Sequence, residues 1–307
     1  MRNNLYTLLK ADEKQVRKIV TKSLKENGYK PIIDEDFIYA EGTIPVLLIA
    51  HYDTVAKPPR FIKNDGGILS GCIGNKPHQL GADDRAGIYA ILELIPKHHC
   101  HVLFTGGEES GGVGATAFTK SGIKPHVNYC LQFDRRGTND AVYYWGDNPD
   151  FEDFITEHGW KTAFGSFTDI VEVCPYLGVM GVNLSIGYDK EHTTSETLDT
   201  KVMNENIQRF AKLLDGEKYE YYESEYDYWN YDYNWDYGKV LSLYDHDDGY
   251  NSKRAEYDFY IRFKDEEGND DDDLLVAYDY FSAVGVFLFN NPTYTYNQII
   301  SCTRLAS

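Results

Sequence analysis

Histidine and carboxylate side chains follow several apolar runs that are typical of buried strands. Burying such charged side chains together costs free energy unless cations neutralise their charge. Nitrogen and oxygen ligands suit zinc, with cobalt or manganese as alternatives, and two cations roughly 3.5–4 Å apart need one shared carboxylate. The pattern therefore predicts a site for two metal ions. The side chains are His51 and Asp53 after "VLLIA", Asp83 and Asp84 in "GADDRAG", Glu108 and Glu109 after "HVLFT", Asp134 ending "YCLQFD", and His192 after "NLSIG".

The elements that must position these groups alternate between apolar strands and helices. Such alternation is typical of an α/β fold with a parallel sheet covered on both faces, in which ligands bind beyond the carboxyl ends of the strands. We expect an amphipathic helix over residues 5–27, ended by Gly28. The stretch 62–84 is rich in turn residues, and no strand is predicted there. Strands are predicted at 44–55, 101–105, 128–134 and 181–187, and helices at 85–95, 112–120, 150–159 and 201–216.

Each motif also has a structural interpretation when it is taken alone. An aspartate in "GADDRAG" could cap a helix, a glutamate in "GGEESGG" could lie at a helix N-terminus, and His192 could be a surface histidine. Unrelated surface loops have no reason to place ligand side chains at five successive strand ends. The metal site is therefore the favoured interpretation.

In this order, "HYDTV", "GADDRAG", "GGEESGG", "FD" and "EHT" resemble the five metal-site motifs of the dinuclear zinc exopeptidase superfamily, which includes bacterial leucyl aminopeptidases and peptidase T. The resemblance covers roughly residues 40–214. It implies a mixed, mostly parallel sheet sandwiched by helices. It also implies a hydrolase of peptide or amide bonds that uses two zinc ions.

The resemblance assigns a role to each matching residue. Asp83 would bridge the two metals, and an unusual cis peptide often follows this position in the family. The other ligands would be His51 and Asp134 on one metal and Glu109 and His192 on the second.

Two acidic residues would act beside the ligands. Asp53 would hold His51 through its distal ring nitrogen, and a spacing of two places both side chains on one face of a strand. Glu108 would be the general base, taking a proton from the attacking water and passing it to the leaving nitrogen. Substrate contacts are predicted at Asp169, Arg135, Arg136 and Tyr188.

Three functions remain open from the sequence. Carboxypeptidase and aminoacylase members carry an inserted domain between the last two ligand motifs, whereas Asp134 and His192 are only 58 positions apart (192 minus 134). This spacing favours a single-domain aminopeptidase acting on short peptides. The alternatives are an N-acyl amino acid amidohydrolase or carboxypeptidase-type enzyme, and a non-catalytic binding protein that uses its acidic aromatic tail.

Charge and cysteine usage exclude some partners. The formal net charge of -19 opposes binding to nucleic acid or to anionic membranes. The five cysteines lack paired spacing, and several lie in apolar runs, which indicates buried free thiols and a reducing compartment. No segment is apolar over the length that spans a bilayer. We therefore expect a cytoplasmic protein with a peptide substrate.

The chain changes character after about residue 215. Residues 219–238 contain ten aromatic side chains among acidic residues and asparagine, which suits a linker, a lid or a surface for a protein partner or for self-association. We expect a catalytic domain at 1–215, a linker or lid at 216–239, and a small β-rich appendage at 240–307. His98, His99 and His101 precede or begin a strand, so they are expected at the edge opposite the metal site.

Overall fold

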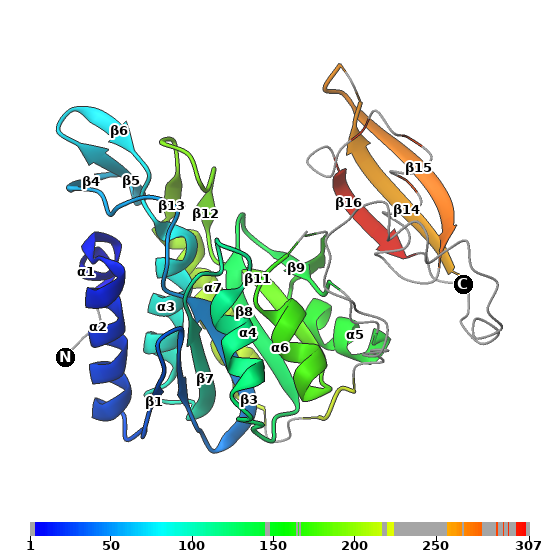
Figure 1. The fold of residues 1–307 in the computed structure, drawn as a ribbon. Coiled ribbons are helices and arrows are strands. Elements are labelled where there is room, and N and C mark those ends of the chain that lie inside the picture. The colour runs from blue at the N-terminus through cyan, green and yellow to red at the C-terminus, as the bar shows by residue number, and fades with distance from the viewer. Residues whose placement is uncertain are drawn as a thin grey trace. The chain divides into compact units, whose positions relative to one another are not determined.

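The computed structural model describes residues 4–144, 148–163, 165, 167–216, 220–223, 257–265, 267–277, 287, 291, 294 and 299–304. The chain divides into two compact units. The first comprises Met1–Lys161 and Phe167–Ser224, and the second comprises Thr162–Ser166 and Glu225–Ser307. Figure 1 labels most elements of the two units.

The first unit begins with two helices rather than the single helix predicted over 5–27. Helix α1 (Leu5–Lys10) ends at Ala11, whose backbone is extended, and α2 (Glu13–Glu26) begins after Asp12. The Asp12 side chain accepts from the backbone N–H of Gln15, while the Gln15 side chain accepts from the N–H of Asp12. This reciprocal cap favours a new helix start over continuation of the first helix.

A mixed eight-stranded sheet forms the centre of the first unit, and its four central strands are parallel. It has the order β1-β2-β7-β3-β8-β11-β9-β10, so the predicted mostly parallel sheet is confirmed at its core. The strands are β1 (Ile32–Ile33), β2 (Phe37–Ala40), β3 (Ile44–His51), β7 (Cys100–Thr105), β8 (Tyr129–Arg135), β9 (Asp140–Val142), β10 (Lys161–Thr162) and β11 (Gly181–Ser185).

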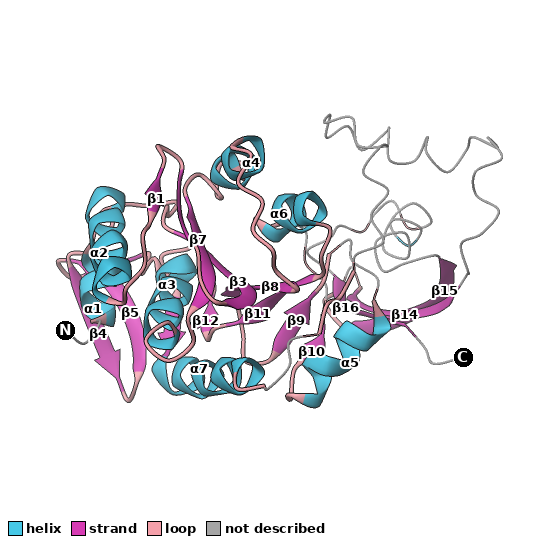
Figure 2. Cartoon of the chain, turned by 90° about the horizontal axis from the view of Figure 1, so that it is seen from below, coloured by secondary structure: helices cyan, strands magenta, loops and turns pink. Residues whose placement is uncertain are grey.

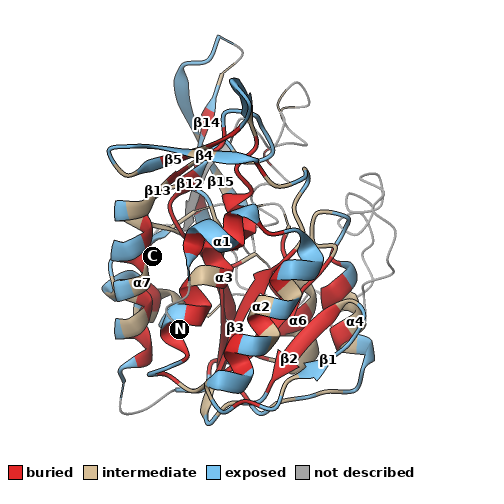
Figure 3. Cartoon of the chain, turned by 90° about the vertical axis from the view of Figure 1, so that its left-hand side faces the viewer, coloured by how far each residue is buried: buried red, intermediate tan, exposed pale blue. Residues whose placement is uncertain are grey.

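Helices cover both faces of this sheet, as predicted (Figure 2). Alternate residues of β3 enter different cores: Val46, Leu48 and Ala50 belong to one apolar cluster, while Leu47 and Ile49 belong to the other. The strand is therefore buried on both faces and is apolar up to its last residue, His51 (Figure 3). The first cluster includes side chains of α1, α2, α3 (Ala82–Leu94), α5 (Pro149–Glu157) and α7 (Thr200–Leu214), and the second includes those of α4 (Val113–Lys120) and α6 (Ile170–Leu177).

A second sheet occupies much of the stretch for which no strand was predicted, and this expectation was wrong. Glycine pairs and exposed polar residues hide these strands, since only parts of them are buried. The sheet has the order β12-β13-β5-β4, with β6 beside β5. Its strands are β4 (Phe61–Asp65), β5 (Ile68–Ile73), β6 (Lys76–His78), β12 (Tyr188–Asp189) and β13 (Thr197–Asp199).

The second unit contains a three-stranded antiparallel sheet with the order β15-β14-β16. Its strands are β14 (Tyr257–Lys264), β15 (Asp270–Ala277) and β16 (Ile299–Arg304). This confirms the prediction of antiparallel strands in the C-terminal part. Most of the acidic aromatic segment 216–239 lies outside the described residues.

Two further observations concern the described residues alone. Cys72, Cys100, Cys130 and Cys174 are free and buried, as predicted for four of the five cysteines. In the parts of the chain with described structure, no helix has the length and apolar character needed to cross a membrane.

Candidate metal centre

The Asp83 carboxylate lies between two imidazoles. Its Oδ1 is 2.9 Å from Nε2 of His51, and its Oδ2 is 3.1 Å from Nε2 of His192. Asp83 lies at the start of α3, His51 ends β3, and His192 lies in the connection between β12 and β13. One carboxylate oxygen therefore faces each histidine, which is the arrangement that a bridging ligand requires.

Further carboxylates lie beside each histidine. Asp134 at the end of β8 places Oδ1 3.6 Å from His51 Nε2, and Glu109 places Oε1 2.9 Å from His192 Nε2. Ligands on one tetrahedral zinc at about 2.1 Å lie about 3.4 Å from one another. Two groups of three side chains have ligand atoms within 4.8 Å of one another, His51 with Asp83 and Glu109, and His51 with Asp84 and Asp134. Such mixed nitrogen and oxygen donors suit a divalent cation.

Asp53 joins three parts of the site. Its Oδ1 is 3.4 Å from Nδ1 of His51, and its two oxygens accept from the backbone N–H groups of Glu108 and Glu109, each at 3.2 Å. The strand β3 ends at His51, so the loop after the strand, rather than strand alternation, places Asp53. A single carboxylate thus orients one imidazole and the backbone of both glutamates.

Asp84 fills the capping role that the structural interpretation of "GADDRAG" predicts. Its carboxylate accepts from Gly87 N–H at 2.9 Å and from His51 N–H at 3.2 Å. A Cβ atom at Gly87 would lie only 2.2 Å from Asp84 Oδ1, so this position requires glycine. The Asp83–Asp84 peptide is cis, as the resemblance implies. Asp84 therefore links α3 to the backbone of a proposed ligand.

Glu108 stands beside the ligand groups with its side chain mostly enclosed. Its Oε2 is 3.9 Å from His51 Nε2. Burial, together with the nearby Asp134, Asp169 and Asp83, raises the pKa of Glu108 to about 9, although His51 opposes the rise. The carboxyl group consequently has a high affinity for a proton in the metal-free protein.

The histidines respond to the surrounding carboxylates. Burial alone would lower the pKa of His51, but Asp134, Asp53 and Asp83 raise it well above its usual value. Hydrogen bonds to Asp83 and Glu109 raise the pKa of His192 to about 11. Protons on the imidazoles thus balance the acidic cluster in the metal-free protein, and bound cations would replace them.

The four predicted substrate contacts fall in different surroundings. Tyr188 is buried and donates its hydroxyl to Asp134 Oδ1 at 3.0 Å. Asp169 is fully buried and accepts from the Thr105 hydroxyl at 2.5 Å, so its carboxylate is not accessible to a substrate here. Arg135 pairs with Asp140 at 3.2 Å, and the half-exposed Arg136 pairs with Glu191 at 3.0 Å.

Sequence reasoning missed other contacts of the site. The Thr168 hydroxyl donates to Asp134 Oδ2 at 2.9 Å, and the Asn183 side chain accepts from Asp134 N–H at 2.9 Å. The carboxylate of Glu196 accepts from the backbone just before Asp83. Glu196 lies four positions after His192, in the same polar loop, and this proximity was the signal available in the sequence.

The histidines near residue 100 lie at the other end of β7, as expected. His99 stacks on Tyr29 with ring centroids 4.0 Å apart. The His98 ring contacts Asp215 at 2.8 Å, and His101 contacts the Tyr39 hydroxyl at 2.9 Å. These contacts give the three side chains packing partners away from Thr105, the end of the strand that leads to the metal centre.

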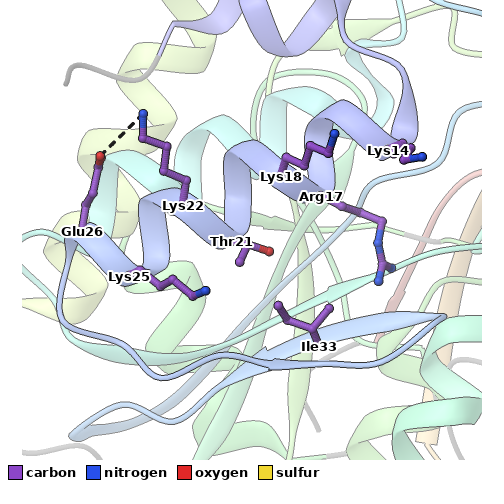
Figure 4. A pocket seen from close by; sticks show the side chains of 8 residues that line it. All are labelled: Lys14, Arg17, Lys18, Thr21, Lys22, Lys25, Glu26 and Ile33. Atoms are coloured by element: carbon purple, nitrogen blue, oxygen red, sulfur yellow. Dashed lines mark ion pairs between the residues drawn. The ribbon is translucent and has the colours of Figure 1, made fainter.

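A cavity of about 620 Å³ lies along α2 rather than at the ligand groups (Figure 4). Basic side chains dominate its lining, and none of its lining residues belongs to the ligand groups. A cluster of ammonium and guanidinium groups does not suit a metal ion. The lining residues are Lys14, Arg17, Lys18, Thr21, Lys22, Lys25, Glu26 and Ile33.

The class of protein follows from a comparison with protein families. The model of peptidase family M28 matches residues 39–214, and the chain belongs to this family. It is therefore a hydrolase of peptide bonds, and the predicted superfamily is confirmed. A comparison with curated protein sequences finds no significant match.

Solved structures show the same fold at low sequence identity. The aminopeptidase PepT from Bacillus cereus is 16% identical with a TM-score of 0.54, and the match covers 68% of this chain and 96% of that one. A tripeptidase from Staphylococcus aureus is also 16% identical with a TM-score of 0.55, covering 68% and 95%. The fold class predicted from the sequence is therefore confirmed.

Proposed function

We propose that this chain is a dinuclear zinc aminopeptidase that hydrolyses short peptides. The observation that carries the proposal is the Asp83 carboxylate, whose two oxygens lie 2.9 and 3.1 Å from the imidazoles of His51 and His192. Asp134 would complete one cation site and Glu109 the other. Cobalt or manganese could occupy the same donors.

The protein's own residues have distinct tasks in this mechanism. Bound cations would polarise the scissile carbonyl and lower the pKa of the attacking water. Glu108 accepts the proton of that water as its oxygen attacks the carbonyl carbon, and then delivers the proton to the leaving nitrogen. Asp53 holds the backbone of Glu108 and keeps this carboxylate beside the reacting atoms.

An acidic site favours a substrate with a free amino group. Glu108 and Glu109 are partly accessible at the ligand groups, whereas the nearby Arg135 and Arg136 are already paired with carboxylates. With cations bound, Glu109 would be neutralised as a ligand, so a protonated amine would meet the negative charge of Glu108, while a free carboxylate would find no unpaired arginine at these two positions. This difference supports an aminopeptidase over a carboxypeptidase.

A substrate panel tests the proposal. We expect the zinc-loaded protein to cleave dipeptides, tripeptides and aminoacyl amides, and to lose this activity when the amino group is acetylated. Glu108→Gln serves as the matched inactive control. Preference for acetylated amino acids would favour the amidohydrolase, and cleavage of neither class by metal-loaded protein would contradict the proposal.

The remaining assignments extend the proposal to the rest of the chain. We assign catalysis to the domain predicted at residues 1–215, which the first compact unit extends to Ser224. We assign 216–239 to a linker or lid whose Tyr/Trp/Asp-rich sequence could bind a protein partner or self-associate, and 240–307 to a small β-rich appendage. Four free buried cysteines support a reducing, cytoplasmic setting. Sedimentation of the full chain and of a chain lacking the last unit would show whether the appendage drives assembly.

A further inference from the structure

The carboxylate of Glu196 is fully buried and accepts four backbone hydrogen bonds. Oε2 accepts from the N–H groups of Leu80 and Gly81 at 3.0 and 2.9 Å. Oε1 accepts from those of Ala82 and Asp83 at 2.7 and 3.2 Å. Both carboxylate oxygens are therefore used to hold four consecutive residues that end at the proposed bridging ligand.

These hydrogen bonds hold the irregular backbone that leads into α3. Gly81 has a φ of 72° and no side chain with which to cap, and Asp83 and Asp84 have non-helical backbone angles. The regular part of the helix therefore begins at the Asp84 cap. Backbone N–H groups that precede the regular turns of a helix have no acceptor within it, and the buried carboxylate of Glu196 supplies one for four of them from a distant segment.

The same side chain connects the loops of two proposed ligands. Glu196 follows His192 by four residues in the connection between β12 and β13, whereas Asp83 lies 113 positions earlier in the chain. His192 is about half exposed, and its contacts to Asp83 and Glu109 are made by Nε2 alone. The buried hydrogen bonds of Glu196 therefore connect the segment that carries His192 to the segment that carries Asp83.

We infer that Glu196 is a positioning residue that fixes Asp83 relative to His192 and so sets the affinity of the site for its cations. This inference rests on the proposed metal-dependent function. Loss of its negative charge would leave buried N–H groups without acceptors, and the chain before Asp83 would relax to find others. The two Asp83 oxygens would then no longer lie close enough to His51 and His192 to share cations with them.

Glu196→Gln tests the inference because it keeps the size of the side chain but loses one acceptor oxygen. The NH2 group of the glutamine would face two backbone N–H groups, so hydrogen-bond donors would oppose each other. The matched control is Asp199→Asn, since Asp199 caps α7 by accepting from the N–H groups of Lys201 and Val202 but contacts no proposed ligand. Both changes remove a carboxylate that accepts from backbone N–H groups at the start of a helical segment, and only Glu196→Gln should alter metal binding.

We would measure zinc binding by calorimetry, the visible spectrum of the cobalt-loaded protein, and thermal unfolding without metal. Glu196→Gln should weaken cation binding by roughly 10–100-fold, the range typical of residues that orient ligands, and should change the cobalt spectrum. Asp199→Asn should lower thermal stability while keeping the wild-type affinity and spectrum. Glu196→Asp, which retains the carboxylate, should recover part of the affinity and provides a test if the glutamine variant does not fold.

Wild-type affinity and an unchanged cobalt spectrum in the folded Glu196 variants would overturn the inference, while the proposed function would stand if wild type still binds two cations and cleaves peptides. Equal losses of affinity in Glu196→Gln and Asp199→Asn would also overturn it, because they would indicate a general effect of stability. If wild type binds no cation, the proposed function fails as well.

Discussion

Glu108 and Glu109 are adjacent in the chain, and replacing each in turn with glutamine should separate two roles. Glu109 Oε1 lies 2.9 Å from His192 Nε2, close enough for both atoms to bind the same cation. Glu108 Oε2 lies 3.9 Å from His51 Nε2, beside rather than within the ligand groups. Glutamine keeps the shape of each side chain, so the two variants differ mainly in which carboxylate they remove.

The expected magnitudes follow from these positions. Glu108→Gln should retain both cations and lower kcat by about 10²–10⁴-fold, the usual contribution of a general base, which equals about 3–5 kcal/mol. Glu109→Gln removes one of three donors to a cation. The affinity of the Glu109→Gln variant for that cation should fall by more than the roughly 10–100-fold loss that is typical when a residue that hydrogen-bonds a metal ligand is removed.

Two assays on the same samples decide between these roles. Metal content after dialysis tests whether Glu109 is a metal ligand. Single-turnover hydrolysis of an aminoacyl amide at saturating zinc tests whether Glu108 is the general base. The reasoning would be refuted if Glu108→Gln lost a cation, or if it kept wild-type kcat with both cations bound. Restored activity of Glu109→Gln at high zinc would be consistent with its role as a ligand.

Three further predictions address the supporting structure. Gly87→Ala should destabilise the protein by about 1–3 kcal/mol, because the new Cβ would displace the Asp84 cap; an unchanged melting temperature would contradict this. The folded-state pKa values of His192 (about 11) and Glu108 (about 9) exceed their usual values of 6.5 and 4.5, so the folded metal-free protein binds more protons than the unfolded chain near pH 7–9. Its unfolding free energy should therefore fall as pH rises across this window, and zinc should flatten the dependence, as denaturant titrations at several pH values would show; a rise with pH would count against the contacts described. Tyr222→Ala should lower the free energy of unfolding by about 3–5 kcal/mol, because the ring of this buried side chain packs on Phe151 with centroids 4.9 Å apart. The folded fraction should keep the wild-type kcat. Equal melting curves for variant and wild type would exclude that packing role.

The gathering of these side chains was predictable because its signal is local. Most of the proposed ligands follow an apolar run, and the carboxyl ends of parallel strands meet at one edge of a sheet. Asp83 is the exception, because it lies at the start of α3. His51 and Asp134 end β3 and β8, which are hydrogen-bonded neighbours, so their proximity follows from the strand order. The role of each residue came from the resemblance rather than from the spacing.

The supporting contacts were not predictable, because they depend on pairings between distant segments. Glu196 accepts from backbone groups more than a hundred residues earlier. Its position near His192 suggests a place close to the site, but no local pattern indicates which backbone groups it binds. The strand β5 has an exposed Ile68 and a buried Leu69, and it pairs with β13 from a distant part of the chain. Short strands with one or two buried residues show little of the alternation that identifies a longer strand.

The boundary of the catalytic part also changes with the structure. The sequence analysis places it at residue 215, where the composition shifts. Tyr222 is buried against Tyr129 and Phe151, and the first compact unit extends to Ser224. Aromatic residues in a low-complexity segment gave no indication that one of them joins the core. A truncation after residue 224 therefore suits functional tests better than one after residue 215.

Anomalous diffraction at the zinc edge from crystals of the metal-loaded protein tests the central claim most directly. The account predicts two peaks roughly 3.5–4 Å apart on either side of the Asp83 carboxylate. One should lie within bonding distance of His51 and Asp134, and the other within bonding distance of His192 and Glu109. A single peak, or peaks bound to other side chains, would contradict the account.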